Sequence, residues 1–162
     1  MQRLLRLTCG LLLLPLMACN PINKATDGCK DADEAVVNTV METVNPDPKI
    51  NGMRKIEFVR AKVIDLPDDM QKFGFNQIMV ITTNQFFDEN HMDEDSRLPG
   101  VETPTTFALN SETDHVAPID KFAKTTFTLT DAAQKDPDWD DWVKSITTTE
   151  AFSTVSGCAD SA

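Results

Sequence analysis

The chain has 162 residues, of which 26 are acidic and 15 are basic, so its formal net charge at pH 7 is −11. An acidic excess of this size disfavours binding to nucleic acid or to anionic lipid headgroups, because like charges repel within a Debye length of about 8 Å. Charged partners are therefore expected to be basic groups or divalent cations, although acidity also keeps a protein soluble.

The first 18 residues have the three-part layout of a secretory signal. Arg3 and Arg6 supply the positive start, a nearly uninterrupted apolar run extends from Leu11 to Leu16, and the small Ala18 precedes a cysteine. A membrane-spanning helix needs about 20 mostly apolar residues, and this run is shorter. We therefore expect export from the cytoplasm and removal of residues 1–18.

At the end of this segment stands Leu16-Met17-Ala18-Cys19. Behind a charged start and an apolar run, these residues resemble the lipobox of a bacterial lipoprotein signal. The resemblance implies that Cys19 becomes the acylated first residue of the mature protein, where two or more acyl chains give stable anchoring. It also implies the outer membrane of a Gram-negative bacterium, because Asn20 rather than aspartate follows the cysteine. An ordinary cleaved signal is the alternative, and Cys9 is discounted as the lipid site because no apolar stretch precedes it.

Removal of the signal leaves 144 residues, the usual size of one domain, with 13 basic and 26 acidic side chains. The mature chain thus has a formal charge of −13. Residues 19–28 form a polar tether that spans at most about 35 Å when extended. We expect the single globular domain, residues 29–162, to lie close to the bilayer.

Two cysteines, Cys29 and Cys158, remain once Cys9 is removed and Cys19 is acylated. In an oxidising periplasm they are expected to form one disulfide bond. A redox pair or metal thiolates are the alternatives, but the chain has no C-x-x-C and no histidine near either cysteine in sequence. The bridge would join the start of the domain to a point four residues from its end.

The first predicted elements are a helix and two strands. Residues 31–45 favour a helix capped by Asp31, with Glu34 completing a capping box and with an apolar stripe of Val37, Val40, Met41 and Val44. Residues 54–66 favour a strand whose apolar phase slips by one residue near Phe58-Val59, as a β-bulge would cause. The stretch from Phe75 to Thr83 is apolar on both faces, which indicates a central strand covered on each side.

The middle of the chain, residues 88–118, is rich in charge and proline and is expected to be irregular, with one short strand at Thr105–Leu109. Such a loop in a small domain is either functional or mobile. Strict alternation from Ala123 to Thr130 predicts a further strand.

The C-terminal part predicts a second amphipathic helix at 137–146, capped by Asp136 with Pro137 at its first position. Its buried stripe is Trp139, Trp142, Val143 and Ile146, and we favour this core role over an exposed aromatic pair that binds carbohydrate or a lipid surface. Residues 147–157 form either a short helix or a strand. The fold class is α+β, with a single antiparallel sheet of about four strands, two amphipathic packing helices, and termini joined by the disulfide.

Two acidic segments are candidate cation sites. The run from Asp88 to Asp95 offers five carboxylates and His91, but it lacks the glycine of a calcium loop, so a solvated loop is expected, with Asp88, Asp93 and Asp95 as weak candidates. The segment from Asp136 to Asp141 also departs from the calcium-loop pattern and is explained by helix capping. No metal site and no cofactor are expected.

Catalytic motifs have little support. The only histidines, His91 and His115, lie in the irregular middle, no serine stands in a G-x-S-x-G elbow, and six scattered glycines form no phosphate-binding loop. The expected function is therefore non-enzymatic: an envelope lipoprotein that binds a protein or glycan partner, or has a structural role, near the membrane. The alternatives are an envelope hydrolase that uses a carboxylate pair and a divalent-cation-responsive module that uses the 88–95 loop.

Overall fold

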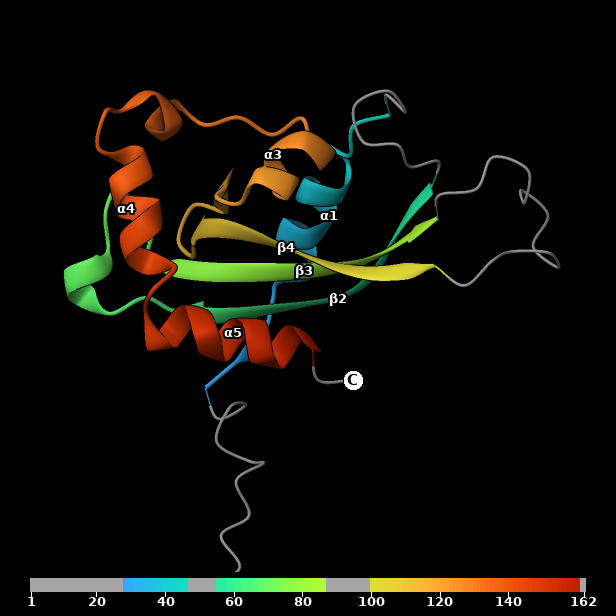
Figure 1. The fold of residues 1–162 in the computed structure, drawn as a ribbon, viewed down its shortest axis with the longest axis horizontal. Coiled ribbons are helices and arrows are strands. Elements are labelled where there is room, and N and C mark those ends of the chain that lie inside the picture. Colours follow the sequence, from blue (N-terminus) through green and yellow to red (C-terminus); the bar gives the residue numbers. More distant parts are fainter. Residues whose placement is uncertain (1–27, 47–54, 87–99, 161–162) are drawn as a thin grey trace, which may run out of the picture.

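The computed structural model describes residues 28–46, 55–86 and 100–160. In this part of the chain, five antiparallel strands form one sheet in the order β1-β2-β3-β4-β5 (Figure 1). The strands are β1 (Lys30–Asp31), β2 (Lys55–Asp65), β3 (Gln77–Phe86), β4 (Val101–Asn110) and β5 (His115–Pro118). The α+β class with a single antiparallel sheet is confirmed, and the strands number five rather than about four.

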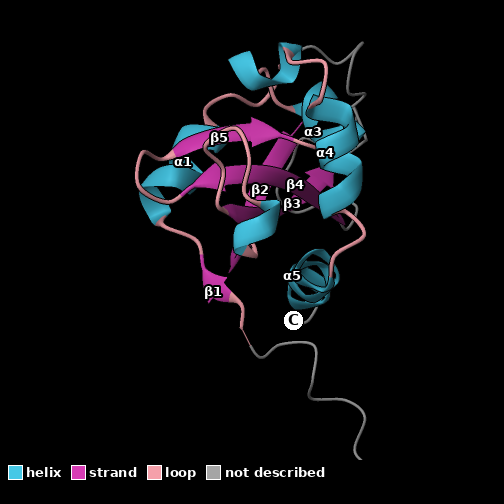
Figure 2. Ribbon diagram, turned by 90° about the vertical axis from the view of Figure 1, so that its left-hand side faces the viewer, coloured by secondary structure: helices cyan, strands magenta, loops and turns pink. Residues whose placement is uncertain are grey.

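Helices cover both faces of the sheet. On one face lie α1 (Glu34–Met41) and α3 (Lys121–Thr126), and on the other lie α4 (Trp139–Ile146) and α5 (Glu150–Asp160), so that α1 and α5 flank the strands in Figure 2. Strand β3 supplies both cores, because Met79 and Ile81 join the α1 side while Ile78 and Val80 join the α5 side. The expectation of a central strand covered on each side is confirmed.

The predicted β-bulge is confirmed. The pairing of β2 with β3 shifts register between Phe58 and Arg60, which leaves Val59 as the extra residue. An extra residue turns every following side chain to the opposite face. As a result, Phe58 and Ala61 lie on the same side of β2, although they are three positions apart.

The first helix begins later than predicted. Asp33, not Asp31, caps α1, and its side chain accepts a hydrogen bond from the Ala35 amide. Asp31 instead belongs to β1, where it pairs with Lys62 of β2. Strand pairing holds the backbone of Asp31 extended, so the helix cannot start there. The Asp31 cap was therefore a wrong assignment, while the helix itself is present.

The strand predicted from Ala123 to Thr130 is wrong. Residues Lys121–Thr126 form α3, and the Asp120 side chain caps this helix by accepting a hydrogen bond from the Ala123 amide. Ala123 and Phe127 are both buried. A spacing of four residues satisfies the helical and the strand periods alike, and the cap decides between them.

The middle of the chain is more regular than expected, because β4 and β5 occupy much of residues 100–118. The predicted strand Thr105–Leu109 is part of β4, which extends through Pro104. β5 pairs only with Phe107–Asn110, so among the described residues the first part of β4, which contains Pro104, lies at an edge of the sheet. A proline is tolerated there because its nitrogen needs no hydrogen-bond partner. Residues 88–99 of the predicted loop lie outside the described residues.

The C-terminal helices complete the fold. Helix α4 begins at Trp139 with Asp138 at its N-cap, and the predicted cap Asp136 instead accepts a hydrogen bond from the Asp138 amide through its side chain. Residues 147–157, whose sequence allows a short helix or a strand, contribute most of α5 (Glu150–Asp160). This helix carries Cys158 to Cys29, and the predicted disulfide is confirmed. Among the described helices, none has the length and apolar character needed to cross a membrane.

Candidate functional site

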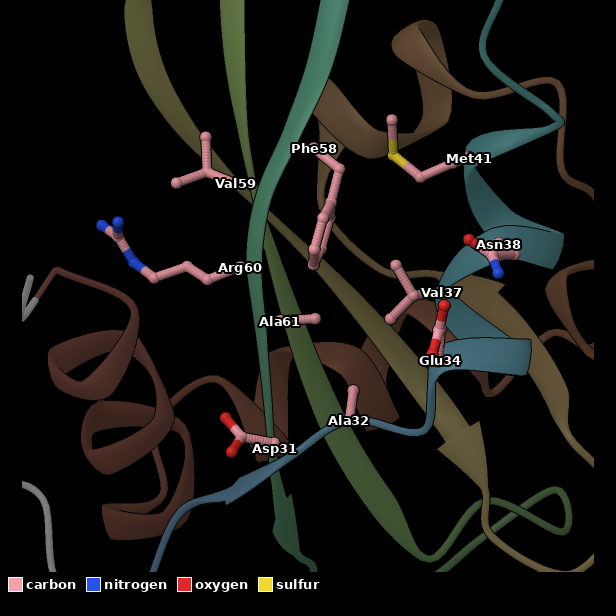
Figure 3. A pocket seen from close by; sticks show the side chains of 10 residues that line it. All are labelled: Asp31, Ala32, Glu34, Val37, Asn38, Met41, Phe58, Val59, Arg60 and Ala61. Atoms are coloured by element: carbon pink, nitrogen blue, oxygen red, sulfur yellow. The ribbon is translucent and has the colours of Figure 1, made fainter.

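A groove of about 480 Å³ lies between α1 and β2 (Figure 3). This volume lies within the range of small binding sites. Most of the residues that line it are apolar or small: Ala32, Val37, Met41, Phe58, Val59 and Ala61, with Asp31, Glu34, Asn38 and Arg60 at its margins. The groove is thus an apolar depression with a few charged groups around it.

The path of β1 creates this groove. β1 pairs with β2 only at Val63 and Lys62, and the last backbone link is the hydrogen bond from the Ala32 amide to the Ala61 carbonyl, 3.2 Å. Beyond Ala32 the chain leaves the edge of β2 and enters α1 two residues later. The edge of β2 before Ala61 therefore faces the groove, and no strand of the described residues pairs with it.

The bulge places an aromatic ring at the groove. Figure 3 shows Phe58 and Ala61 on the α1 side of β2, with Val59 and Arg60 directed to the opposite side. Phe58 is 46% exposed and Val59 is 37% exposed, and both are among the exposed large hydrophobic residues of the described chain. Exposed apolar side chains beside a concave apolar surface are a feature of interaction sites.

Basic side chains near the groove are already held by acidic partners. The Arg60 guanidinium donates from Nε to the Ala159 carbonyl and pairs with Glu102, each over 2.7 Å. Lys62 pairs with Asp31 over 2.6 Å. Glu34 lies exposed in the first turn of α1 on the opposite rim. Of the charged residues that line the groove, Asp31 and Arg60 are each neutralised by an oppositely charged side chain, and Glu34 is an exposed acid.

The structure places the other residues singled out in the sequence away from this groove. The two tryptophans belong to the α5-side core, with Trp139 1% and Trp142 6% exposed, which confirms their structural role. His115 pairs with Asp131 and stacks on Phe75 with ring centroids 5.1 Å apart. This contact ties β5 to the segment that follows α3.

The predicted lipidation residue Cys19 and the acidic candidates Asp88, Asp93 and Asp95 lie outside the described residues, so their roles remain predictions. Within residues 28–46, 55–86 and 100–160, no group of three or more histidine, cysteine, aspartate or glutamate side chains could hold a metal ion.

Among the carboxyls of the described residues, that of Asp65 has a shifted pKa. The hydrogen bond from Gln77, and next the adjacent Lys30 ammonium, hold the pKa of Asp65 below its usual value. A general acid requires a raised pKa, so Asp65 does not suit acid catalysis. Its ion pair with Lys30 instead links β2 to β1.

Sequence reasoning missed the groove as a site. Its one detectable signal was the phase slip at Phe58-Val59, which predicts that a bulge presents an aromatic residue near the start of a strand. That β2 is an edge strand there, with α1 beside it, depends on pairing between segments far apart in the sequence.

Comparison of the chain with protein-family models, with curated proteins and with solved structures found no match.

Proposed function

We propose that this chain is a lipid-anchored protein of the bacterial cell envelope, held in the outer membrane through Cys19, that binds a partner non-enzymatically at the α1–β2 groove. The observation that carries the binding function is the half-exposed Phe58 over an apolar groove beside β2. The signal-like segment and the resemblance of Leu16-Met17-Ala18-Cys19 to a lipobox support the anchor.

An aromatic side chain at such a position favours recognition. Aromatic residues that fill a partner's pocket, or that line one, contribute a large share of binding energy at interfaces. Phe58 would be better protected from water inside the core, yet the bulge directs it to the groove, where Val37 and Met41 of α1 add further apolar surface. The groove is therefore suited to bind an apolar side chain of a partner.

The anchor would restrict where that partner is found. A tether of about ten residues reaches at most about 35 Å, and the Cys29–Cys158 bridge fixes its far end to the folded domain. The partner is then a molecule that comes within a few nanometres of the same membrane.

The anchor is tested by intact-mass spectrometry of the protein purified from its own host, together with membrane fractionation of wild type and Cys19→Ser. We expect a mature chain that starts at Cys19 and carries two or three acyl chains, and a Cys19→Ser variant without them that leaves the membrane fraction. An unmodified amino terminus, or one that retains residues 1–18, would contradict the anchor.

The groove is tested by photo-crosslinking in intact envelopes. A photoreactive amino acid replaces Phe58 in one variant and Val101, which is 54% exposed but outside the groove, in the matched control. We expect a discrete adduct from position 58 that is absent from position 101 and diminished by Cys19→Ser. Equal adducts from both positions would show that the groove has no special role.

A further inference from the structure

The two edges of the sheet differ in how completely they are covered. At the β5 edge, Val116 to Pro118 are buried, Pro118 has no amide hydrogen to offer, and Gln134 donates a side-chain hydrogen bond to the Pro118 carbonyl over 3.2 Å. These features cover the edge and prevent further strand pairing. The β5 edge is therefore closed.

The β2 edge is closed only at one end. β1 pairs with Val63 and Lys62, and the Ala32 amide donates a hydrogen bond to the Ala61 carbonyl. No strand in the described parts of the chain pairs with the outer edge of β2 from Lys55 to Arg60. Six residues of strand extend about 20 Å. An edge of this length presents a row of backbone donors and acceptors to any extended segment that lies beside it.

The open edge and the apolar groove lie side by side. Figure 3 shows that Phe58, next to α1, lies on the segment of β2 whose outer edge has no strand neighbour in the described parts of the chain. An extended peptide placed there would form backbone hydrogen bonds with β2, and every second side chain would enter the groove toward Phe58, Val37 and Met41. Backbone pairing and side-chain burial would thus act on the same ligand.

We propose that the α1–β2 groove binds a basic, extended peptide segment, which adds to the sheet as a strand along Lys55–Arg60 and places alternate apolar side chains against Phe58. This inference rests on the proposed binding function and names the chemistry of the partner. The strand would continue the line of β1, which already occupies the neighbouring part of the same edge.

Charge selects the occupant. The mature chain has a formal charge of −13, so a second copy of it would be repelled, whereas a basic segment is attracted. Around the groove, the guanidinium of Arg60 and the ammonium of Lys62 are bound to Glu102 and Asp31, while Glu34 lies exposed on the rim. A lysine or arginine side chain of the partner would lie next to Glu34.

The ligand side is tested with the full chain, purified from whichever cell fraction contains it, and labelled seven-residue peptides. The first peptide alternates lysine and valine, and the second replaces each lysine with glutamate. We expect saturable binding of the lysine peptide that weakens as salt is raised, and at least roughly tenfold weaker binding of the glutamate peptide. Equal binding of the two peptides would overturn the basic partner.

Strand addition is tested by N-methylation of the lysine peptide at every second residue, in each of the two possible frames. Backbone amides of a strand point alternately to its two edges. One frame is therefore expected to abolish binding, because it removes the hydrogens that face β2, and the other frame to preserve it. Strand addition would be overturned if both methylated peptides lost binding, or if both retained it. This test uses the unaltered protein.

The protein side is tested with matched variants. Phe58→Asp should weaken binding of the lysine peptide by roughly tenfold or more. Val101→Asp, at another exposed apolar residue, should leave this binding unchanged. Glu34→Lys should weaken it several-fold, while Glu150→Lys, in the first turn of α5, should not. Unchanged binding by Phe58→Asp, with its fold verified by circular dichroism, would overturn the site.

The outcomes separate this inference from the proposed function. Acyl chains at Cys19 with no peptide binding would leave the anchor in place and remove the basic strand. An envelope adduct at position 58 without peptide binding would assign the groove to another chemistry. A concentration-dependent dimer that Phe58→Asp dissociates would make a second copy the occupant and overturn the basic peptide.

Discussion

Loss of the Cys29–Cys158 disulfide should cost this domain a large part of its stability. The two cysteines are 129 residues apart in sequence, with Cα atoms at 6.6 Å. In the chain-entropy treatment, a cross-link that closes a loop of about 130 residues stabilises the folded state by about 5 kcal/mol, because it restricts the unfolded chain. A typical domain is stable by only about 5–15 kcal/mol.

The measurement is urea unfolding of the wild type and of the double variant Cys29→Ser, Cys158→Ala. Alanine is chosen at position 158 because this cysteine is buried, and a hydroxyl there would add a separate cost. The variant should lose about 5 kcal/mol and have a larger dependence on urea, since its unfolded chain exposes more surface.

A reducing agent provides the control, since it should bring the wild type to the level of the variant and leave the variant unchanged. A loss below about 2 kcal/mol would refute the loop-closure reasoning. Equal sensitivity of both proteins to the reducing agent would show that another thiol reaction is responsible.

The remaining predictions concern single side chains. Asp120→Ala should destabilise the domain by about 2–3 kcal/mol in urea unfolding, because Asp120 caps α3 and also accepts a hydrogen bond from the Thr106 amide. Trp142→Phe should cost about 1–2 kcal/mol in the same assay, because it removes the 2.8 Å hydrogen bond from Trp142 Nε1 to the Met70 carbonyl. The lowered pKa of Asp65 should make its contribution to stability full above its unfolded pKa of about 3.9 and lost as the pH falls through its folded pKa. Acid titration of thermal stability in wild type and Asp65→Asn measures this.

Each of these predictions has an outcome that would contradict it. Asp120→Asn keeps only one of the two acceptor oxygens, because Oδ1 accepts from the Ala123 amide and Oδ2 from the Thr106 amide, so its stability should lie between those of the wild type and Asp120→Ala. An Asp120→Ala variant as stable as the wild type would contradict the role of the two hydrogen bonds. A Trp142→Phe variant as stable as the wild type would mean that the bond to Met70 contributes nothing net. The effect at Asp65 should be small, since the carboxylate is 62% exposed and solvent screens it, and an Asp65→Asn profile that loses more stability with acid than the wild type would reverse the assigned sign.

Several elements of this fold could be predicted from the sequence because the deciding information is local. The phase slip at Phe58-Val59 predicts the bulge, since side chains alternate strictly along a strand. The spacing of Trp139, Trp142 and Ile146 predicts a helix with one buried face, and all three are buried. The disulfide followed from counting, because two cysteines were left to pair.

Other features were decided only by contacts between distant segments. Asp31 has the sequence of a helix cap, yet pairing with Lys62 keeps it in β1. Ala123 and Phe127 suit a strand and a helix equally, and the cap Asp120 that makes them helical is itself held by the Thr106 amide of β4. In both cases, local patterns leave two conformations of similar free energy, and a partner far away in the chain selects one.

The candidate site belongs to this second kind. The sequence alone determined that the chain is acidic, that it carries a signal-like start, and that β2 contains an irregularity at Phe58. Only the tertiary structure decided that β1 ends before it covers this part of the edge and that α1 stands beside it. The physical reason is that an edge and a groove are relations between segments, and their backbone groups carry no residue-specific pattern from which pairing could be inferred.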